Sequence, residues 1–201
     1  MRETSKQYQL APPGAGLPWL ELQIVRGIFH VSARLSNHAH ASQMFAEEEL
    51  LIVDVMDQFN EREGEQEVLI KRLRGLEDSS RYWSAYMTLS HVAIVNRAVV
   101  QIIHSLLDGK VPATAARIAD VKPVPIGKEA LSTFREVNAS FTDISRSVKN
   151  LRTPLTFAHP WFGELDGARW HFLAGFHMRL HREQLNAILA HVRVNRDFRS
   201  R

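Results

Sequence analysis

Apolar residues recur at three- and four-residue steps over most of the chain, and this helical period limits its fold more than any other feature. Such steps place apolar side chains on one face of an α-helix. The pattern is longest and most regular in four segments, 43–63, 81–107, 128–150 and 166–194. The sequence shows neither the strict alternation that marks strands nor an internal repeat. It therefore predicts an all-α protein, a four-helix bundle with long crossover connections.

Signals for helix starts support these boundaries. Ser42 is a plausible N-cap for the first of the four helices, and Asp166 for the last. A further segment with helical spacing, 18–35, precedes the four and is interrupted by Gly27. We expect it to form an additional helix, whole or broken at the glycine.

Two long connections join the later helices. The stretch 110–127 reads "KVPATAARIADVKPVPIG", with three prolines and no sustained period, and 151–166 reads "LRTPLTFAHPWFGELD". Loops of this length inside a compact domain often act as lids or covers over functional sites. We expect both to be structured loops near a site.

A length of 201 residues with 45% hydrophobic residues suits one domain with one sizeable core. We expect three parts. Residues 1–17, with their prolines and glycines, form a mobile leader; residues 18–195 form a single helical domain; and residues 196–201 form a short basic tail.

Charge and composition exclude several classes of partner. The 25 basic residues exceed the 22 acidic ones only slightly, so no basic surface for nucleic acid is predicted. The N-terminus lacks the apolar core of a signal peptide, and no apolar run approaches the roughly 20 residues of a membrane span. A cytoplasmic protein is expected. The chain has no cysteine, so any nucleophilic thiol would have to come from another molecule.

Three histidines fall on the apolar faces of two predicted helices. In "GFHMRLHREQ", His177 and His181 share the face of Trp170 and Leu173. In the segment 81–107, His91 lies in the middle of the apolar face. Because the apolar faces of a bundle meet, the three imidazoles are expected to converge.

Convergence of three inward imidazoles points to a metal. A buried polar group without a partner costs about 1–3 kcal/mol, and a shared divalent ion accepts all three lone pairs. Two histidines four apart on one helix can bind one ion, and three protein ligands leave a coordination position open, as in catalytic sites. We therefore predict that His91, His177 and His181 are metal ligands. The alternative is that each is an ordinary core or boundary histidine.

Other polar residues are weaker candidates. Glu48 interrupts an apolar stripe and could act as a general base, a fourth ligand or an acceptor for a ligand's N–H. A solvated position is the preferred interpretation, because Glu48 stands in an "EEE" run. Trp83 is taken as a packing residue. The other histidines are expected to face away (His104), to shape a loop (His159), to lie off the inward stripe (His171, His191) or to lie in the uncertain early region (His30, His38, His40).

The segments "GLEDSSRYWSAYMTLSHVAIVN", "HPWFGELDGARW" and "FHMRLH" resemble, in this order, the DinB/YfiT-like proteins. The resemblance covers most of residues 76–193. It implies a four-helix bundle with a long crossover, a homodimer, and a divalent metal, zinc or nickel, held by His91, His177 and His181. Relatives in that family include thiol-dependent transferases and isomerases that act on small molecules, and other relatives are labelled as metal hydrolases. The resemblance therefore implies an activity of one of these kinds.

Three functions follow as alternatives. The first is a metal-dependent transferase or isomerase that uses a low-molecular-weight thiol, held as thiolate by the metal. The second is a metal-dependent hydrolase that activates a water, with Glu48 as the only inward base that can be named. The third is a dimerising bundle without enzymatic activity. In all three, nucleic acid and membranes are not expected partners.

Overall fold

The computed structural model describes the backbone of residues 8–199 and the side chains of residues 8–194. Its α-helices are α2 (Trp19–Leu35), α3 (His38–Met56), α4 (Glu61–Glu65), α5 (Ala85–Leu107), α6 (Glu129–Ser147) and α7 (Gly167–Arg199). Short 3-10 helices are η1 (Asp78–Ser80) and η2 (Ile118–Val121). The strands are β1 (Val68–Leu69), β2 (Tyr82–Trp83), β3 (Phe157–His159) and β4 (Gly163–Leu165).

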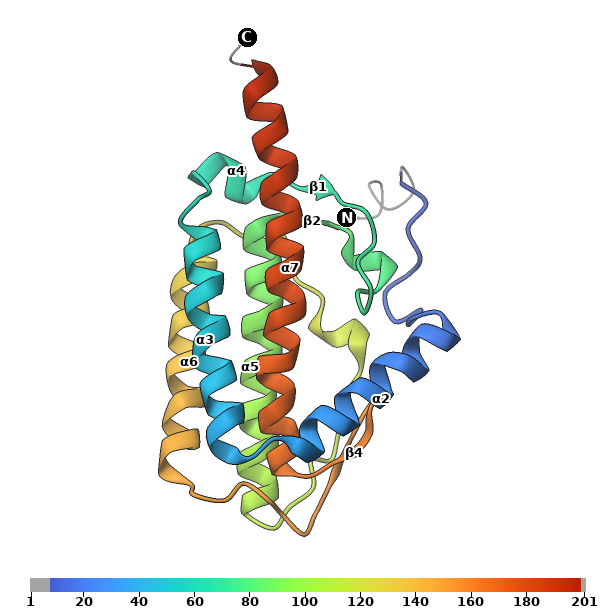
Figure 1. Ribbon diagram of the computed structural model, residues 1–201, viewed down its shortest axis with the longest axis vertical. Coiled ribbons are helices and arrows are strands. Elements are labelled where there is room, and N and C mark those ends of the chain that lie inside the picture. The colour runs from blue at the N-terminus through green and yellow to red at the C-terminus, as the bar shows by residue number, and fades with distance from the viewer. Residues whose placement is uncertain (1–7, 200–201) are drawn as a thin grey trace.

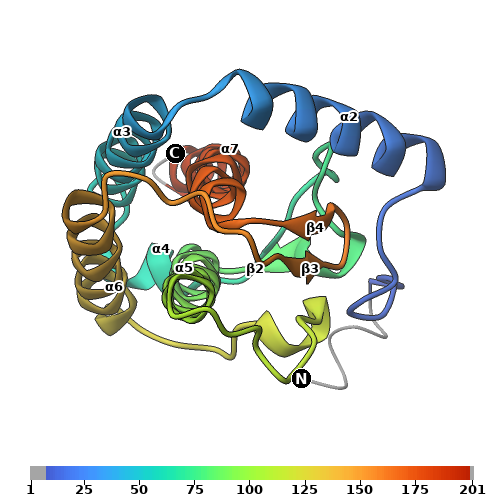
Figure 2. The same cartoon turned by 90° about the horizontal axis from the view of Figure 1, so that it is seen from below.

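The four long helices α3, α5, α6 and α7 form the bundle, as the periodicity predicts. Helix α7 packs against α3 on one side and α5 on the other, and α5 packs against α6 (Figures 1 and 2). Stacked rings of Phe45 and Phe141, with centroids 4.0 Å apart, join α3 to α6 in the core. Gly175 lies where α3 and α7 approach closely, since a Cβ there would lie 3.2 Å from the Phe45 backbone nitrogen. The all-α, four-helix-bundle prediction is confirmed.

Of the two predicted N-caps, the one for α7 agrees with the structure and the one for α3 does not. The Asp166 carboxylate accepts a hydrogen bond from the Arg169 N–H at 2.9 Å, so the predicted cap of α7 is confirmed. Ser42 is not the cap of α3, because the helix begins one turn earlier with Asn37 as its N-cap. The Ser42 hydroxyl instead donates to the His38 carbonyl within the helix.

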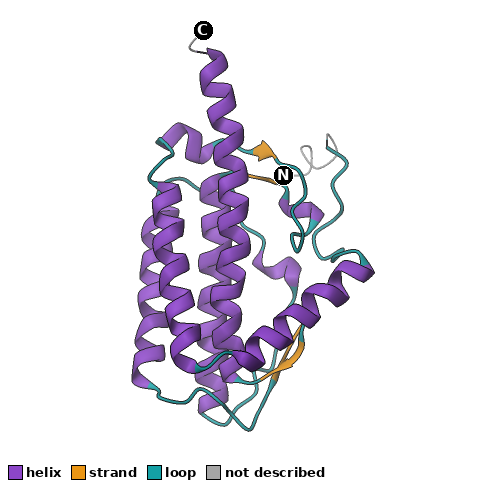
Figure 3. Ribbon diagram, in the orientation of Figure 1, coloured by secondary structure: helices purple, strands orange, loops and turns teal. Residues whose placement is uncertain are grey.

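Two antiparallel hairpins were not predicted and lie beside the bundle (Figure 3). In one, Val68 pairs with Trp83; in the other, Phe157 pairs with Leu165. Strands of two or three residues are too short to show an alternating pattern, so the sequence carries no signal for them. The two hairpins matter for the site because they hold two loops against α5 and α7.

Helix α2 is continuous through Gly27 and lies outside the four-helix bundle, where it slants away from the side of α7 (Figures 1 and 2). Its single fully buried side chain is Phe29, which stacks on Phe162 with centroids 4.2 Å apart. At its N-terminal end, Glu21 pairs with Arg72, and in its middle the Arg26 guanidinium donates to the Trp161 carbonyl at 2.6 Å. These anchors hold α2 over the loops on one side of the bundle.

The two predicted ends of the chain are described in part. Residues 8–17 run along the loop before β2, where the Ala11 and Gly16 N–H groups donate to Asp78 and Glu77. Residues 1–7 lie outside the described residues, and the mobility of the leader stays a prediction. The backbone of residues 196–199 continues α7, so only 200–201 of the predicted tail lie beyond the described helix.

Helix α5 alone, among the described residues, is long and apolar enough to pass for a membrane span. In the bundle 61% of that stretch is buried by neighbouring helices, as expected of a helix at the centre of a core. Its apolar character is therefore accounted for by packing against α6 and α7.

His171 was expected to lie off the inward face, but it is buried at 1% exposure between α3, α6 and α7. Its Nε2 lies 3.4 Å from the Ser42 hydroxyl and 3.3 Å from that of Ser145. These serines supply the polar contacts that let an imidazole enter the interface. Burial, assisted by the neighbouring His38, lowers the pKa of His171 to about 4.

This burial predicts a specific dependence of stability on pH. Because the folded pKa is about 4 and the usual value 6.5, the unfolded chain takes up a proton that the folded chain refuses between these pH values. The contribution of His171 to the free energy of unfolding is therefore constant above pH 6.5 and falls by up to about 3 kcal/mol towards pH 4. The free energy of unfolding, measured with urea at pH values from 7 to 4, should therefore decrease less towards pH 4 for His171→Gln than for the wild type. A His104→Gln control, at an exposed position of α5, should follow the wild type, and an unchanged slope for His171→Gln would contradict the prediction.

Candidate metal centre

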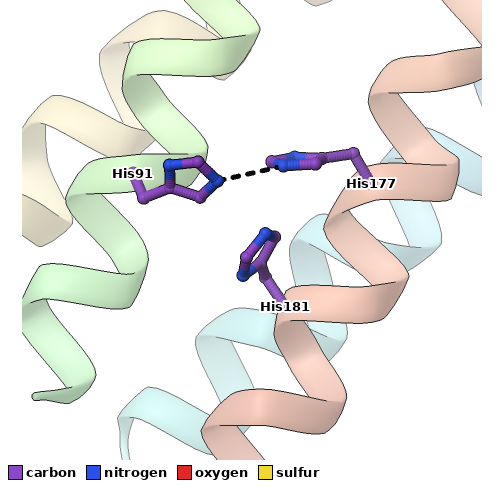
Figure 4. A group of neighbouring side chains, drawn as sticks. All are labelled: His91, His177 and His181. Carbon is purple, nitrogen blue, oxygen red and sulfur yellow. Dashed lines mark hydrogen bonds between the residues drawn. The ribbon is translucent and has the colours of Figure 1, made fainter. Parts of the chain in front are cut away.

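The packing of α5 against α7 brings the three predicted histidines together (Figure 4). His91 comes from α5, while His177 and His181 stand one turn apart on α7. One ring nitrogen from each lies within 4.8 Å of the other two, and the Nε2 atoms of His91 and His177 are 3.1 Å apart. The convergence predicted from helical spacing is confirmed in the described residues.

The cluster lies on the side of the bundle that faces the loops. His91 and His181 are buried, and His177 is half-buried. All three line a cavity of about 1090 Å³ between α5, α7 and the covering segments. Its apolar wall is formed by aliphatic residues of α5 and aromatic residues of the β3–β4 hairpin and α7, among them Val95, Ala98, Ile102, Phe157, Trp161, Phe162 and Phe176. A cavity of this size holds a drug-sized small molecule.

The hydrogen bonds of His91 determine which of its nitrogens is free. The Nδ1 atom lies 2.7 Å from the Val121 carbonyl in η2. A carbonyl only accepts hydrogen bonds, so Nδ1 carries the proton and Nε2 presents its lone pair to the cluster. An imidazole held through the opposite nitrogen in this way is the usual arrangement of a metal-ligating histidine.

His181 is held in the same tautomer by a side chain. Its Nδ1 lies 2.8 Å from Gln184 Oε1, while Gln184 Nε2 donates to the Ser80 carbonyl at 2.8 Å. The carbonyl of Ser80 needs a donor, which fixes the Gln184 amide with its oxygen towards His181. The Nε2 lone pair of His181 therefore also faces the cluster.

His177 leaves a polar atom without a partner. Its Nε2 contacts His91 Nε2, and its buried Nδ1 has no hydrogen-bond partner in the described residues. The Nε2 lone pairs of His91 and His181 face the same spot, where the single N–H of the His177 ring is the one donor available to both. A divalent cation satisfies all three Nε2 atoms, since metal–nitrogen bonds of about 2.0–2.1 Å require donor atoms this close together. The side chains present fit a three-histidine metal site.

Burial keeps the cluster neutral. The pKa of His91 is lowered to about 4, chiefly by burial and further by the charge of Lys122. The pKa values of His177 and His181 lie well below the usual range, because both rings are buried and lie beside other imidazoles. Neutral imidazole is the form that binds metals, so no proton has to be displaced at neutral pH.

A buried ion pair supports the cluster from the loops. Lys122 Nζ lies 2.8 Å from Glu77, and it also donates to the hydroxyls of Ser79 and Ser80 at 2.8 Å. Lys122 follows Val121, which holds His91, and Ser80 holds Gln184 and through it His181. The ion pair therefore ties together the two loops that orient two of the three imidazoles.

Trp83 has a place in the site as well as in the packing. Its ring centroid lies 5.1 Å from that of His91, and its plane is within 13° of parallel to that of His181. Lys122 Nζ lies 5.2 Å from the centre of the same ring. The indole therefore packs against two of the imidazoles and also lies within cation–π distance of the Lys122 ammonium.

The preferred solvated position of Glu48 is wrong. The side chain is buried between α3 and α7, where Arg182 Nε donates to its carboxylate at 2.6 Å. None of its three functional roles (general base, fourth metal ligand and acceptor for a ligand's N–H) is supported, because the Arg182 guanidinium holds the carboxylate. The partner is 134 positions away in the sequence, which explains why local context suggested solvent.

Two of the remaining histidines lie as the sequence predicts. His104 is exposed, as predicted, and His159 accepts the N–H groups of Trp161 and Phe162, so it shapes the loop as predicted. No sequence pattern marked Lys122 or Glu77 as part of the site. Both lie in irregular segments, where no periodic signal assigns a residue to the inside.

Comparisons with known proteins support the fold. No protein-family model and no curated protein matches the chain. The crystal structure of TT2238, a four-helix bundle protein, superposes with a TM-score of 0.56 at 17% identity, covering 75% of this chain and 99% of that one. This likeness supports a four-helix bundle, and membership of the DinB/YfiT-like family stays a hypothesis that rests on the sequence segments.

Gln184 offers a test of how the imidazoles are held. Replacing Gln184 by Met removes the acceptor for His181 Nδ1–H, and we expect the affinity of the apoprotein for zinc to fall about 10- to 100-fold. Gln184→Glu retains an acceptor at that point and should preserve most of the affinity. Competition titration against a chromophoric chelator measures both, with circular dichroism to compare folding. Equal zinc affinity for wild type and Gln184→Met would contradict a role of this residue in orienting the ligand.

Proposed function

We propose that the protein is a metal-dependent enzyme whose divalent ion, zinc or nickel, is held by His91, His177 and His181. The observation that carries this proposal is the convergence of three neutral Nε2 atoms at one wall of a large cavity. Three protein ligands leave at least one position of a four-coordinate ion for a further molecule, as in catalytic zinc sites. The cavity provides room for that molecule and for a substrate beside it.

We further propose a thiol-dependent transferase or isomerase. When bound, the ion would supply Lewis-acid chemistry and keep a coordinating thiol deprotonated and nucleophilic. The chain has no cysteine, so the thiol would be a separate low-molecular-weight cofactor. The apolar wall of the cavity would exclude water from the reacting groups and accept the uncharged part of an electrophilic substrate.

The electrostatics around the histidines support an anionic guest such as a thiolate. Lys122 lowers the pKa of His91 and His181 through its charge, so its ammonium acts on the cluster. The ammonium is paired with Glu77, so the pair has no net charge, but its cationic end is the one that acts on the histidines. A cationic end beside the site favours a bound anion.

The same observations weigh against a hydrolase that relies on a carboxylate base. Every acidic side chain lining the cavity already has a partner: Glu47 with Gln43, Glu48 and Glu183 with Arg182, Glu77 with Lys122, and Asp120 with Arg117. A general base must lie within hydrogen-bond reach of the water it activates. Glu48, the base that the sequence suggested, is instead buried in an ion pair with Arg182, so the hydrolase alternative loses its named base.

Metal content provides the first test. The wild-type protein, purified and supplied with zinc, should retain about one ion per chain, and its melting temperature should fall when a chelator removes the ion. His177→Ala should bind far less, because two ligands hold zinc much more weakly than three. His104→Ala, which changes an exposed histidine of α5, is the matched control. Equal zinc content of His177→Ala and wild type by elemental analysis would remove the basis of the proposal.

Turnover provides the second test. The zinc-loaded protein should accelerate the conjugation of a low-molecular-weight thiol to an electrophile such as an activated alkene or epoxide, and chelation or His177→Ala should reduce the rate at least 100-fold. Loss of the free thiol measures the reaction. If esters or amides are instead hydrolysed at a rate indifferent to added thiol, the thiol-dependent assignment fails and the hydrolase replaces it.

A further inference from the structure

The outer face of α2 carries a continuous apolar stripe that nothing in residues 8–199 covers. It consists of residues at steps of four, four, three and four, and their exposed fractions are large: Leu20 64%, Ile24 55%, Ile28 53%, Val31 60% and Leu35 82%. This set is called the outer stripe below. Single exposed apolar residues are common on protein surfaces, but an aligned row on one helix face marks an interaction site.

The orientation of the stripe is fixed by the opposite face of α2. Phe29 is fully buried among the rings of Phe162, Phe172 and Phe176. Arg26 is held by the Trp161 carbonyl and Glu21 by Arg72. The helix cannot turn its stripe inward without breaking these contacts, so the stripe stays exposed, and of its five residues Ile28 alone also lines the cavity.

The size of the stripe suits one half of a modest protein interface. With these exposed fractions its five side chains present on the order of 500 Å² of apolar surface, in the range that marks interaction sites. Two such faces together would bury roughly 1,000 Å², the lower bound for a specific interface.

Gly27 is unexplained within one chain. Glycine is the poorest helix former after proline, and a Cβ added at position 27 would meet no atom within 4 Å. No turn or internal contact of the protein therefore requires glycine here. A glycine on the open side of a helix allows the backbone of another helix to approach closely, which gives it a role only when a partner is present.

We propose that the outer stripe is an interface between two copies of this chain, with the two α2 helices antiparallel about a two-fold axis near Gly27. Eight residues of α2 precede Gly27 and eight follow it. An antiparallel pair centred there places Ile24 of one copy beside Val31 of the other, and Leu20 beside Leu35. The stripe is thus complementary to itself, as a two-fold interface requires. The proposed interface contains none of the three histidines, and it shares only Ile28 with the cavity beside them.

A membrane surface fits the stripe less well than a second copy. Helices that lie on anionic lipid carry many lysines or arginines on their polar face. The only basic side chains of α2, with histidines left aside, are Arg26 and Arg34, and Arg26 is held by Trp161. The helix therefore lacks the charge that would favour lipid.

The first experiment measures the oligomeric state. Sedimentation equilibrium of the full chain should give a dimer, and the double variant Ile24→Glu/Val31→Glu should weaken association at least 100-fold, because it places like charges opposite one another in the interface. Val124→Glu, at an equally exposed apolar position after η2, should remain dimeric. A monomeric wild-type protein, or a double variant that still dimerises, would overturn the proposal, as would co-flotation of the wild type with anionic phosphatidylserine vesicles.

The second experiment uses the absence of cysteine from the chain. Gly27→Cys would introduce the single thiol of the protein next to the two-fold axis, and mild oxidation should convert most of it to a disulfide-linked dimer within minutes. Val124→Cys should cross-link only slowly, through collision. Equal rates for the two variants, measured on non-reducing gels at matched concentration, would show that α2 does not pair with α2.

Discussion

The contact between α5 and α7 is the interaction on which the rest of the structure depends. It places His91 opposite the one-turn pair His177 and His181, with nitrogen atoms close enough to share a single ion. The same contact removes the rings from water, which lowers their pKa values and keeps them neutral. Burial alone would be costly for such groups, and the cost is offset by acceptors placed behind two of the rings and by the ligand position in front of all three.

Those acceptors come from outside the bundle. The loops that contain η1 and η2 supply the Ser80 and Val121 carbonyls, and the Glu77–Lys122 ion pair joins the two loops. Gly16, near the N-terminus, donates to the same glutamate. The orientation of the imidazoles therefore depends on three chain segments that contribute no ligand, and the bundle by itself would leave the rings less well defined.

The covering segments also give the molecule two distinct faces. On the inner side, α2 lines the cavity with Val25, Ile28 and Ser32, the β3–β4 hairpin lines it with aromatic side chains, and Phe29 anchors the helix. On the outer side, α2 presents apolar residues to the surroundings. One helix can thus serve both as a wall of the proposed site and as a contact surface, with Ile28 at the edge between the two.

Helical spacing alone was enough to predict the four-helix bundle, the inward position of His91, His177 and His181, and the Asp166 cap, because a regular period states which side chains share a face. The roles of Glu48, His171, Gln184 and Lys122 were decided only by tertiary structure. Each depends on a partner that is remote in sequence or on a loop without a period: Arg182 for Glu48, Ser42 for His171, the Ser80 carbonyl for Gln184 and Glu77 for Lys122. A hydrogen bond or ion pair is set by distance in space, and a one-dimensional pattern carries no measure of that distance outside a regular helix.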